Sequence, residues 1–237
     1  MTTSLEEIME ELEQMGTEQT KNTFLRHGAK EPFFGVRVGD MKKLVKVVKK
    51  DQELARSLFE TGNSDAMYLA GLTVNPKLMS KEMLQQWVNQ AHWYMVSEYT
   101  VAWLTAESPY AVELAREWIL SPDELIATCG WSTYSNYISI TPDDNLDLEE
   151  IKQLLKQVEN GIHQERNRVR YNMNAFVINV GAYVVPLFEE AMRVAEVIGK
   201  VHVDLGQTAC KVPLATEYID KIEKLGKTGK KKKTCIC

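Results

Sequence analysis

Cysteine is scarce in this sequence, with four among 237 residues. Cys129 and Cys210 are isolated, while Cys235 and Cys237 lie at the end of the chain, so the sequence predicts neither a disulfide framework nor a CxxC metal pair. No two of the four histidines have the spacing of metal ligands. We therefore expect no metal and no cofactor.

Long apolar runs are missing as well. Charged residues interrupt the longest apolar stretches within about a dozen residues, whereas a membrane-spanning helix needs about 20. The first 20 residues hold six acidic residues and no basic one, the opposite of the basic and then apolar pattern of a signal peptide. We expect a cytoplasmic protein with no membrane partner.

An excess of positive charge is also missing. The chain has 28 Lys and Arg against 33 Asp and Glu, a net charge of −5, which is unfavourable for binding nucleic acid. The basic residues are clustered, however, and a cluster can contact a phosphate backbone even on an acidic protein. Solvated helix faces and a solubilising tail explain the same clusters equally well. The clusters are Lys42, Lys43, Lys46, Lys49 and Lys50; Arg166, Arg168 and Arg170; and Lys227, Lys230, Lys231, Lys232 and Lys233.

Apolar residues recur at helical spacing in nearly every segment. From residue 52 onward the expected helices read as pairs, whose first members begin near 52, 81, 110, 148 and 186. Such offsets are typical of helical-hairpin repeats, which bury their apolar faces by stacking on one another. We predict an all-α fold, an α-solenoid of helical repeats; a non-repetitive helical bundle is the alternative, because the period is loose. Helices are expected near 4–15, 17–27, 38–50, 52–61, 64–74, 80–91, 93–106, 109–120, 123–139, 147–163, 167–183, 186–198 and 214–225.

One segment departs from the helical pattern. In residues 200–212 β-branched residues alternate with polar ones around Gly206-Gln207, which predicts a β-hairpin. A hairpin alone has too little core to be stable, so it must pack on the solenoid or order on a ligand. Lys200 and Lys211 at its base would suit a hairpin that enters a DNA groove, and a loop closing the last repeat is the alternative. We expect one domain over residues 1–226 and a flexible basic tail over 227–237.

Three short motifs carry a resemblance to a known family: Phe33–Leu44, His92–Ser97 and Glu117–Ser121. The chain resembles the HEAT-like-repeat alkylpurine DNA glycosylases of the AlkD type over roughly residues 20–200. The resemblance implies a C-shaped helical solenoid. Its concave face, lined by the second helix of each pair, is then expected to be basic and to hold duplex DNA. Fold transfers between relatives more safely than activity does.

The resemblance also implies an active site. Those enzymes hold the lesion with aromatic side chains, and a carboxylate stabilises the positive charge that develops on deoxyribose as the glycosidic bond breaks. The family's first tryptophan matches Trp93, its carboxylate position falls on Ser97, and its second tryptophan matches Phe176. Serine can hydrogen-bond phosphate but cannot supply the charge. Glu98 is adjacent in sequence, but one residue turns about 100° around a helix, so we expect it to point away.

A second departure concerns the family's arginine. Its expected position falls near Cys129, and the chain has no Lys or Arg between Arg116 and Lys152. With the carboxylate and the arginine both missing, the chain most resembles the AlkF/AlkG branch. Those relatives keep the scaffold and an affinity for DNA, notably branched DNA, without evident base excision.

We therefore predict a monomeric DNA-binding protein of the DNA alkylation repair superfamily. Its partner is expected to be duplex, branched or damaged DNA, such as a Holliday junction, with little or no base excision. One alternative is an active glycosylase that removes positively charged N3- or N7-alkylpurines, and another is a protein-binding α-solenoid scaffold. The expected DNA contacts are Trp93, Ser97, Arg166, Arg168, Arg170, Lys42, Lys43, Phe176, Lys200 and Lys211.

Overall fold

The computed structural model describes residues 4–236, and in this range the chain forms helices and loops without a β-strand. The α-helices are α1 (Leu5–Met15), α2 (Glu18–Arg26), α3 (Lys42–Val48), α4 (Gln52–Glu60), α5 (Ser64–Thr73), α6 (Lys81–Gln90), α7 (Tyr94–Val96), α8 (Ala102–Ala106), α9 (Ala111–Ile119), α10 (Glu124–Ile140), α11 (Leu148–Gly161), α12 (Asn167–Tyr183), α13 (Phe188–Ile198) and α14 (Ala215–Lys224). Four short 3₁₀ turns, η1 (Pro76–Leu78), η3 (Asp143–Asn145), η4 (Ile162–Gln164) and η5 (Val185–Leu187), and a π-helical turn, η2 (Ser97–Val101), complete the helical structure.

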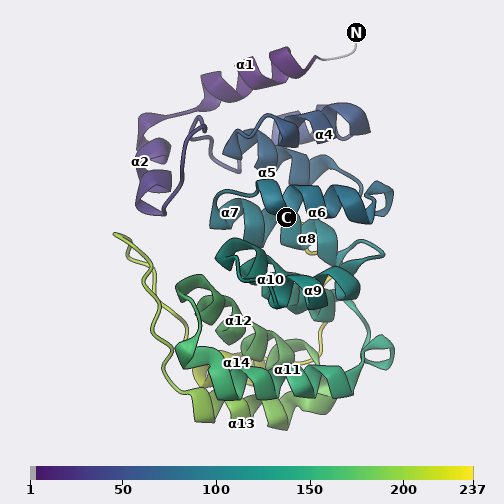
Figure 1. The fold of residues 1–237 in the computed structure, drawn as a ribbon, viewed down its shortest axis with the longest axis vertical. Coiled ribbons are helices and arrows are strands. Elements are labelled where there is room, and N and C mark those ends of the chain that lie inside the picture. The colour runs from purple at the N-terminus through teal and green to yellow at the C-terminus, as the bar shows by residue number, and fades with distance from the viewer. Residues whose placement is uncertain (1–3, 237) are drawn as a thin grey trace.

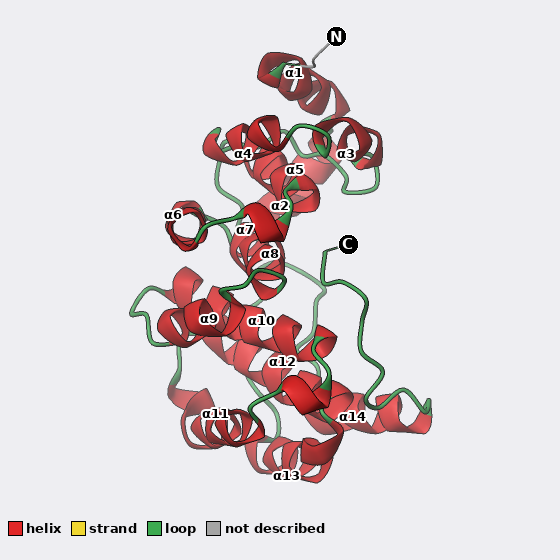
Figure 2. Ribbon diagram, turned by 90° about the vertical axis from the view of Figure 1, so that its right-hand side faces the viewer, coloured by secondary structure: helices red, strands yellow, loops and turns green. Residues whose placement is uncertain are grey.

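From α4 onward the helices stack as pairs along the long axis of the molecule (Figure 1). Seen end-on, α4, α6, α9, α11 and α13 form an outer row, and α5, α8, α10 and α12 form an inner row (Figure 2). The stack is curved. Its inner row, together with α3 at one end and α14 at the other, faces the concave side, which we call the inner face. The predicted pairing of helices is therefore confirmed.

Local signals explain where several helices begin. The Ser80 hydroxyl accepts from the backbone N–H of Met83 at the start of α6, and the Asp147 carboxylate accepts from that of Glu150 in α11. Each side chain satisfies one of the amides that a helix leaves unpaired in its first turn. Short polar residues before apolar runs thus fix the start of both outer helices.

The outer and inner rows differ in how they are buried. Outer helices such as α9 bury one face, whereas α10 is buried on nearly every side. At Gly130 of α10 a Cβ atom would lie 2.5 Å from the Ile119 nitrogen of α9, so only glycine permits this approach of the two helices. Apolar residues fill the space between successive pairs in two clusters, which meet at α9 and α10. Each pair is therefore stabilised by its neighbours, as the repeat pattern requires.

The helix expected over 93–106 is interrupted. It consists of α7, the π-helical turn η2 and α8. Ser97 and Glu98 lie in η2, and both are bonded to distant elements: the Ser97 hydroxyl donates to the Leu125 carbonyl at 2.6 Å, and the Glu98 carbonyl accepts from Ser132 at 2.8 Å. Such π-turns occur often at functional sites.

The β-hairpin predicted over 200–212 is wrong. The segment forms an extended arm that leaves the body and returns to it (Figure 1), but no strand is present within residues 4–236. Instead of pairing across the arm, the backbone of Asp204 exchanges hydrogen bonds with the side chain of Asn167 on α12. The Asp204 carboxylate in turn accepts from the Gly206 N–H. Side-chain bonds to the backbone have replaced the expected ladder.

Residues 227–236 also differ from the free tail that the sequence suggested. They pass along the inner face towards α8, and their backbone is hydrogen-bonded to α12 and α10 (Figure 2). The Cys235 side chain is buried. The basic composition predicted a solvated segment, but the carbonyls that α10 and α12 leave unpaired at their ends offer it hydrogen bonds that composition does not reveal.

No single helix in the part of the chain described here is long and apolar enough to cross a membrane. The segments Asn167–Tyr183 and Val185–Ile198 meet the length and composition criteria only together, and the chain bends by 117° between them.

Candidate functional site

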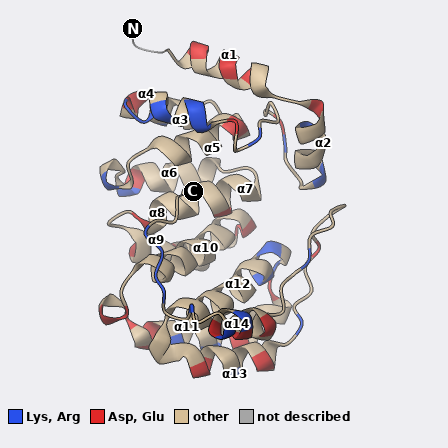
Figure 3. Cartoon of the chain, turned by 180° about the vertical axis from the view of Figure 1, so that it is seen from behind, with Lys and Arg blue, Asp and Glu red and all other residues tan. Residues whose placement is uncertain are grey.

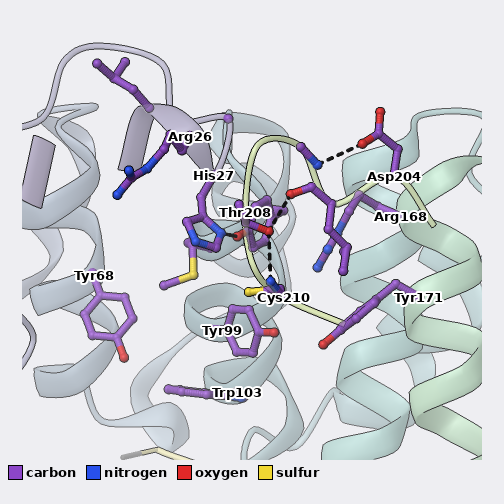
Figure 4. A pocket seen from close by; sticks show the side chains of 16 residues that line it. Arg26, His27, Tyr68, Tyr99, Trp103, Arg168, Tyr171, Asp204, Thr208 and Cys210 are labelled. Carbon is purple, nitrogen blue, oxygen red and sulfur yellow. Dashed lines mark hydrogen bonds between the residues drawn. The ribbon is translucent and has the colours of Figure 1, made fainter. Parts of the chain in front are cut away.

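A pocket with a volume of about 510 Å³ opens on the inner face. It lies between the end of α2, the α7–α8 segment, the start of α12 and the arm at residues 204–210. Aromatic side chains form part of both walls, with Tyr68, Tyr99 and Trp103 on one side and Tyr171, beside Arg168, on the other (Figure 4). We call it the aromatic pocket.

Arg168 and Glu98 form an ion pair at the base of this pocket. Arg168 Nε lies 3.0 Å from Glu98 Oε1, and Arg168 Nη2 lies 2.5 Å from Oε2. The guanidinium also stacks on two rings, with its carbon 4.1 Å from the centre of the Tyr94 ring and 4.3 Å from that of Tyr171. Paired and stacked in this way, the side chain has a single defined position.

Burial controls the charge of the pocket. Desolvation raises the pKa of the Glu98 carboxyl, and the Arg168 guanidinium opposes that shift. Burial also raises the pKa of Tyr94 to about 12 and lifts the pKa of Tyr99 and Tyr171 above the ordinary value. The phenols are therefore neutral near pH 7, Arg168 is balanced by Glu98, and the two remaining charged residues of the lining, Arg26 and Asp204, are of opposite sign. An almost neutral pocket with aromatic walls suits a planar ring better than a phosphate.

The π-helical turn aims these side chains. It places Glu98 inward, towards α12, and presents Tyr99 and Trp103 to the pocket. The backbone N–H of Arg168 donates to a carboxylate oxygen of Glu124 at the start of α10. Three helical pairs thus meet at the base of the pocket, because the chain brings α7–α8, α10 and α12 together there.

The three positions that the resemblance assigned to an active site are all buried. Trp93 packs on Phe24, with ring centres 5.1 Å apart, and its indole N–H donates to the His27 carbonyl. Ser97 has no exposed surface, and Phe176 packs against the buried ring of Trp131. Large aromatics most often fill the core, and these do so here. The structure thus places no surface at these positions from which DNA could be touched.

The basic candidates lie in separate places. Arg166 donates to the carbonyls of Ser121 and Pro122 and so ties down the loop before α10. Arg170 is partly buried one turn further along α12. Lys42 and Lys43 are exposed on α3, while Lys200 and Lys211 are exposed on the arm. Among the predicted residues, only Arg168 belongs to the aromatic pocket.

Sequence reasoning missed most of the pocket. Tyr94 and Glu98 have the same four-residue spacing as Trp93 and Ser97, one position later. The sequence therefore contains an aromatic residue and a carboxylate one helical turn apart, but the family resemblance pointed to Trp93 and Ser97 beside them. The structure brings Arg168 to Glu98 from a later repeat, whereas the intervening segment between Arg116 and Lys152 has no Lys or Arg.

Comparison with known proteins agrees with this architecture. Residues 8–219 match the family described as DNA alkylation repair enzyme. The chain belongs to this family. Two uncharacterised proteins, one from Listeria monocytogenes and one from Listeria innocua, are each 36% identical to it over 224 residues, which is 92% of this chain and 96% of theirs.

A solved structure gives a closer view of the fold. It is described as a new family of proteins related to the HEAT-like repeat DNA glycosylases with affinity for branched DNA structures. The two chains are 38% identical and superpose with a TM-score of 0.91, over 99% of this chain and 100% of the other. The stacked helix pairs of this DNA alkylation repair family member therefore form the predicted HEAT-like solenoid.

Proposed function

We propose that this protein binds DNA along its inner face and recognises branched or distorted DNA with little or no base excision. The aromatic pocket carries this proposal. Bases at a branch point are partly unstacked, and an unstacked base gains free energy by stacking on an aromatic side chain, by about 1–3 kcal/mol per base. The solved relative with affinity for branched DNA supports the same assignment.

The geometry of the pocket fits such a base. Tyr99 and Trp103 are partly exposed on one wall, and Tyr171 faces them across the opening (Figure 4). A base that leaves its stack at a junction would lie between these walls. Arg26 at the mouth of the pocket is exposed and would contact the adjoining phosphate.

Base excision finds less support. It needs a carboxylate that faces the sugar of the lesion as positive charge develops. Two acids lie at the pocket: Glu98 at its base is buried, and both of its oxygens accept from Arg168. Asp204 lines the pocket from the arm, where it is exposed to water and accepts from the Gly206 N–H. A carboxylate that is already neutralised supplies little further stabilisation to a cationic transition state. We infer that the pocket binds a base without cleaving its bond.

Binding titrations would test this proposal. Fluorescence anisotropy should compare a four-way junction, a bulged duplex and a plain duplex of equal length, with the junction bound most tightly. Trp103→Ala should weaken junction binding about tenfold, in line with the loss of one stacking contact. Leu120→Ala is the matched control, because Leu120 is 78% exposed at the end of the outer helix α9. Failure of the wild type to bind any of these DNAs at low salt would refute the function.

Oligomeric state and location belong to the same proposal. We propose a cytoplasmic protein that binds one junction as a monomer. Sedimentation of the protein with an equal amount of junction DNA should give a 1:1 complex, and a 2:1 complex would contradict the monomer.

A further inference from the structure

The inner helices carry few cations of their own. Within their described bounds α5, α8 and α10 have no Lys or Arg, and α12 has only Arg168 and Arg170, both near its start. Their C-terminal ends are worse suited to phosphate, because unpaired carbonyls give a helix C-terminus a partial negative charge. A DNA backbone lying across this edge of the inner face would therefore be repelled unless another part of the chain supplied positive charge.

Residues 227–236, which we call the strap, cover this edge. The Gly229 N–H donates to the Ala182 carbonyl at the end of α12, and the Lys232 N–H donates to the Ser139 carbonyl at the end of α10, each at 2.8 Å. Lys231 turns inward: its ammonium donates to the Ile138 carbonyl at 2.9 Å. The strap thus occupies carbonyls that the ends of these helices leave unpaired.

The end of the strap is anchored on α8. One carboxylate oxygen of Glu107, the residue that follows α8, accepts from the Thr234 hydroxyl at 2.5 Å and from the Cys235 N–H at 2.6 Å. The same oxygen lies 3.4 Å from the Ile236 nitrogen. The Cys235 side chain is only 3% exposed. Three donors on one carboxylate and a buried side chain hold the strap to the body.

The docked strap leaves most of its lysines facing solvent. Lys230, Lys232 and Lys233 are exposed, whereas Lys231 is hydrogen-bonded to α10. The end of the strap and α3 line one groove of about 1280 Å³. Thr234 and Ile236 contribute to it from the strap, and Lys42, Lys46 and Lys49 contribute from α3. Figure 3 shows the strap crossing in front of the inner helices, with its lysines in blue and α3 above it.

We propose that the strap is a fixed part of the DNA-binding surface, which gives the inner face a phosphate-binding track along the edge away from the aromatic pocket. The proposal rests on the proposed DNA binding and adds to it the residues that hold the backbone. The partial negative charge of a helix C-terminus attracts lysine, which helps to hold the strap on these helices. The strap lysines in turn offset that negative charge, which would otherwise repel phosphate. Phosphates of the bound DNA would lie along Lys230, Lys232 and Lys233 and continue to α3.

The first test removes the charge and keeps the anchor. The triple variant Lys230→Gln/Lys232→Gln/Lys233→Gln should lower the dependence of log K on log salt by about 2.7, since each phosphate contact contributes about 0.9. The matched control, Lys81→Gln/Lys152→Gln/Lys156→Gln, makes the same change of net charge at solvent-accessible positions on the outer helices α6 and α11. It should leave most of the slope intact.

The second test releases the anchor and adds no negative charge. Glu107→Ala makes the protein more positive, so simple electrostatics predicts tighter DNA binding. If the strap proposal is right, release of the strap instead weakens junction binding by about tenfold at 0.15 M salt. The two explanations therefore differ in sign. Cys235 gives a readout without DNA: in a Cys237→Ser background its thiol should resist labelling in the parent protein, while exposed Cys210 reacts, and should become reactive in Glu107→Ala.

The outcomes separate the two proposals. If the parent protein binds no DNA, the proposed function fails. If it binds junctions but both triple lysine variants have the same affinity and salt slope, DNA binding stands and the strap proposal is overturned. Rapid labelling of Cys235 in the parent protein, or tighter binding by the strap triple variant, overturns it too.

Discussion

Arg168 closes over Glu98 from a position 70 residues further along the chain. In a stack of helix pairs each repeat contacts mainly its neighbours. This ion pair instead joins the second helix of one repeat to that of the next repeat but one, across the start of α10. It therefore fixes the curvature of the inner face at the place where the aromatic pocket opens.

Breaking the pair should strongly destabilise the protein. Arg168→Met would leave the Glu98 carboxylate buried without a partner, and removing one member of a buried pair typically lowers the free energy of unfolding by about 3–5 kcal/mol. The double variant Arg168→Met/Glu98→Leu should recover most of this loss, because no charge is then left in the core. Urea unfolding of the wild type, Arg168→Met, Glu98→Leu and the double variant measures the effect. A double variant that shows the sum of two large single losses would contradict it.

Ser97→Asp should damage the protein without creating a glycosylase. If Ser97 occupied the family's carboxylate position, aspartate there would restore base excision. The structure buries this side chain and directs its hydroxyl to the Leu125 carbonyl, so an aspartate would face a carbonyl oxygen with no cation beside it. We expect a loss of about 3 kcal/mol or more in the free energy of unfolding.

Ser97→Ala serves as the control, since it loses one hydrogen bond and about 1 kcal/mol. Release of 7-methylguanine from methylated DNA should stay at the level of heat-treated DNA alone for both Ser97 variants. A clear increase with Ser97→Asp would show that this position faces the substrate after all.

The helical stack was predictable because its signals are local. Apolar spacing sets the faces of each helix, and short polar residues such as Ser80 and Asp147 fix where helices begin. The π-helical turn at 97–101 was not predictable, since it depends on bonds from Ser97 and Glu98 to partners in later repeats. The prediction for residues 200–212 was wrong for a similar reason. Alternation of β-branched and polar residues predicted two paired strands, but the Asn167 side chain hydrogen-bonds the backbone N–H and carbonyl of Asp204 instead.

The residue pair singled out in the sequence and the pair at the aromatic pocket are one position apart. An aromatic side chain and a polar partner one turn apart were expected at Trp93 and Ser97, whereas the pocket is built around Tyr94 and Glu98. A shift of one position turns about 100° around a helix, so Tyr94 lines the pocket while Trp93 stays in the core. No local signal in the sequence marks which of the two faces the solvent.

Close packing of the two rows should make Gly130 hard to replace. Alanine has the higher helix propensity by about 1 kcal/mol, so Gly130→Ala would stabilise an isolated α10. In the protein its Cβ would lie 2.5 Å from the Ile119 nitrogen and 2.9 Å from the Trp118 carbonyl carbon, and backbone atoms cannot move aside. We expect a fall of several degrees in Tm. Gly161→Ala is the control, because a Cβ there meets nothing within 4 Å; equal effects of the two substitutions would refute the packing argument.

Glu150 should make stability depend on acidic pH. Its carboxylate accepts from the Arg116 guanidinium and, at 2.7 Å, from the Tyr134 hydroxyl, and so links α9, α10 and α11. The Arg116 guanidinium holds the pKa of Glu150 below its ordinary value. A lowered pKa means that the folded protein favours the ionised form. Its contribution is therefore complete above the unfolded pKa, near 4.5, and is lost as the pH falls through the lower folded value.

Glu150→Gln should accordingly cost about 1 kcal/mol at pH 7, where the ionised pair is present, and progressively less between pH 4.5 and pH 3. Urea unfolding of both proteins at pH 7, 5, 4 and 3 measures this narrowing difference. Glu149→Gln provides the comparison, since Glu149 is exposed beside it and meets only Lys152 at 3.3 Å, so its substitution should have little effect at any of these pH values. A difference between wild type and Glu150→Gln that stays constant from pH 7 to pH 3 would mean that the carboxylate keeps its proton equilibrium on folding, contrary to the ion pair with Arg116.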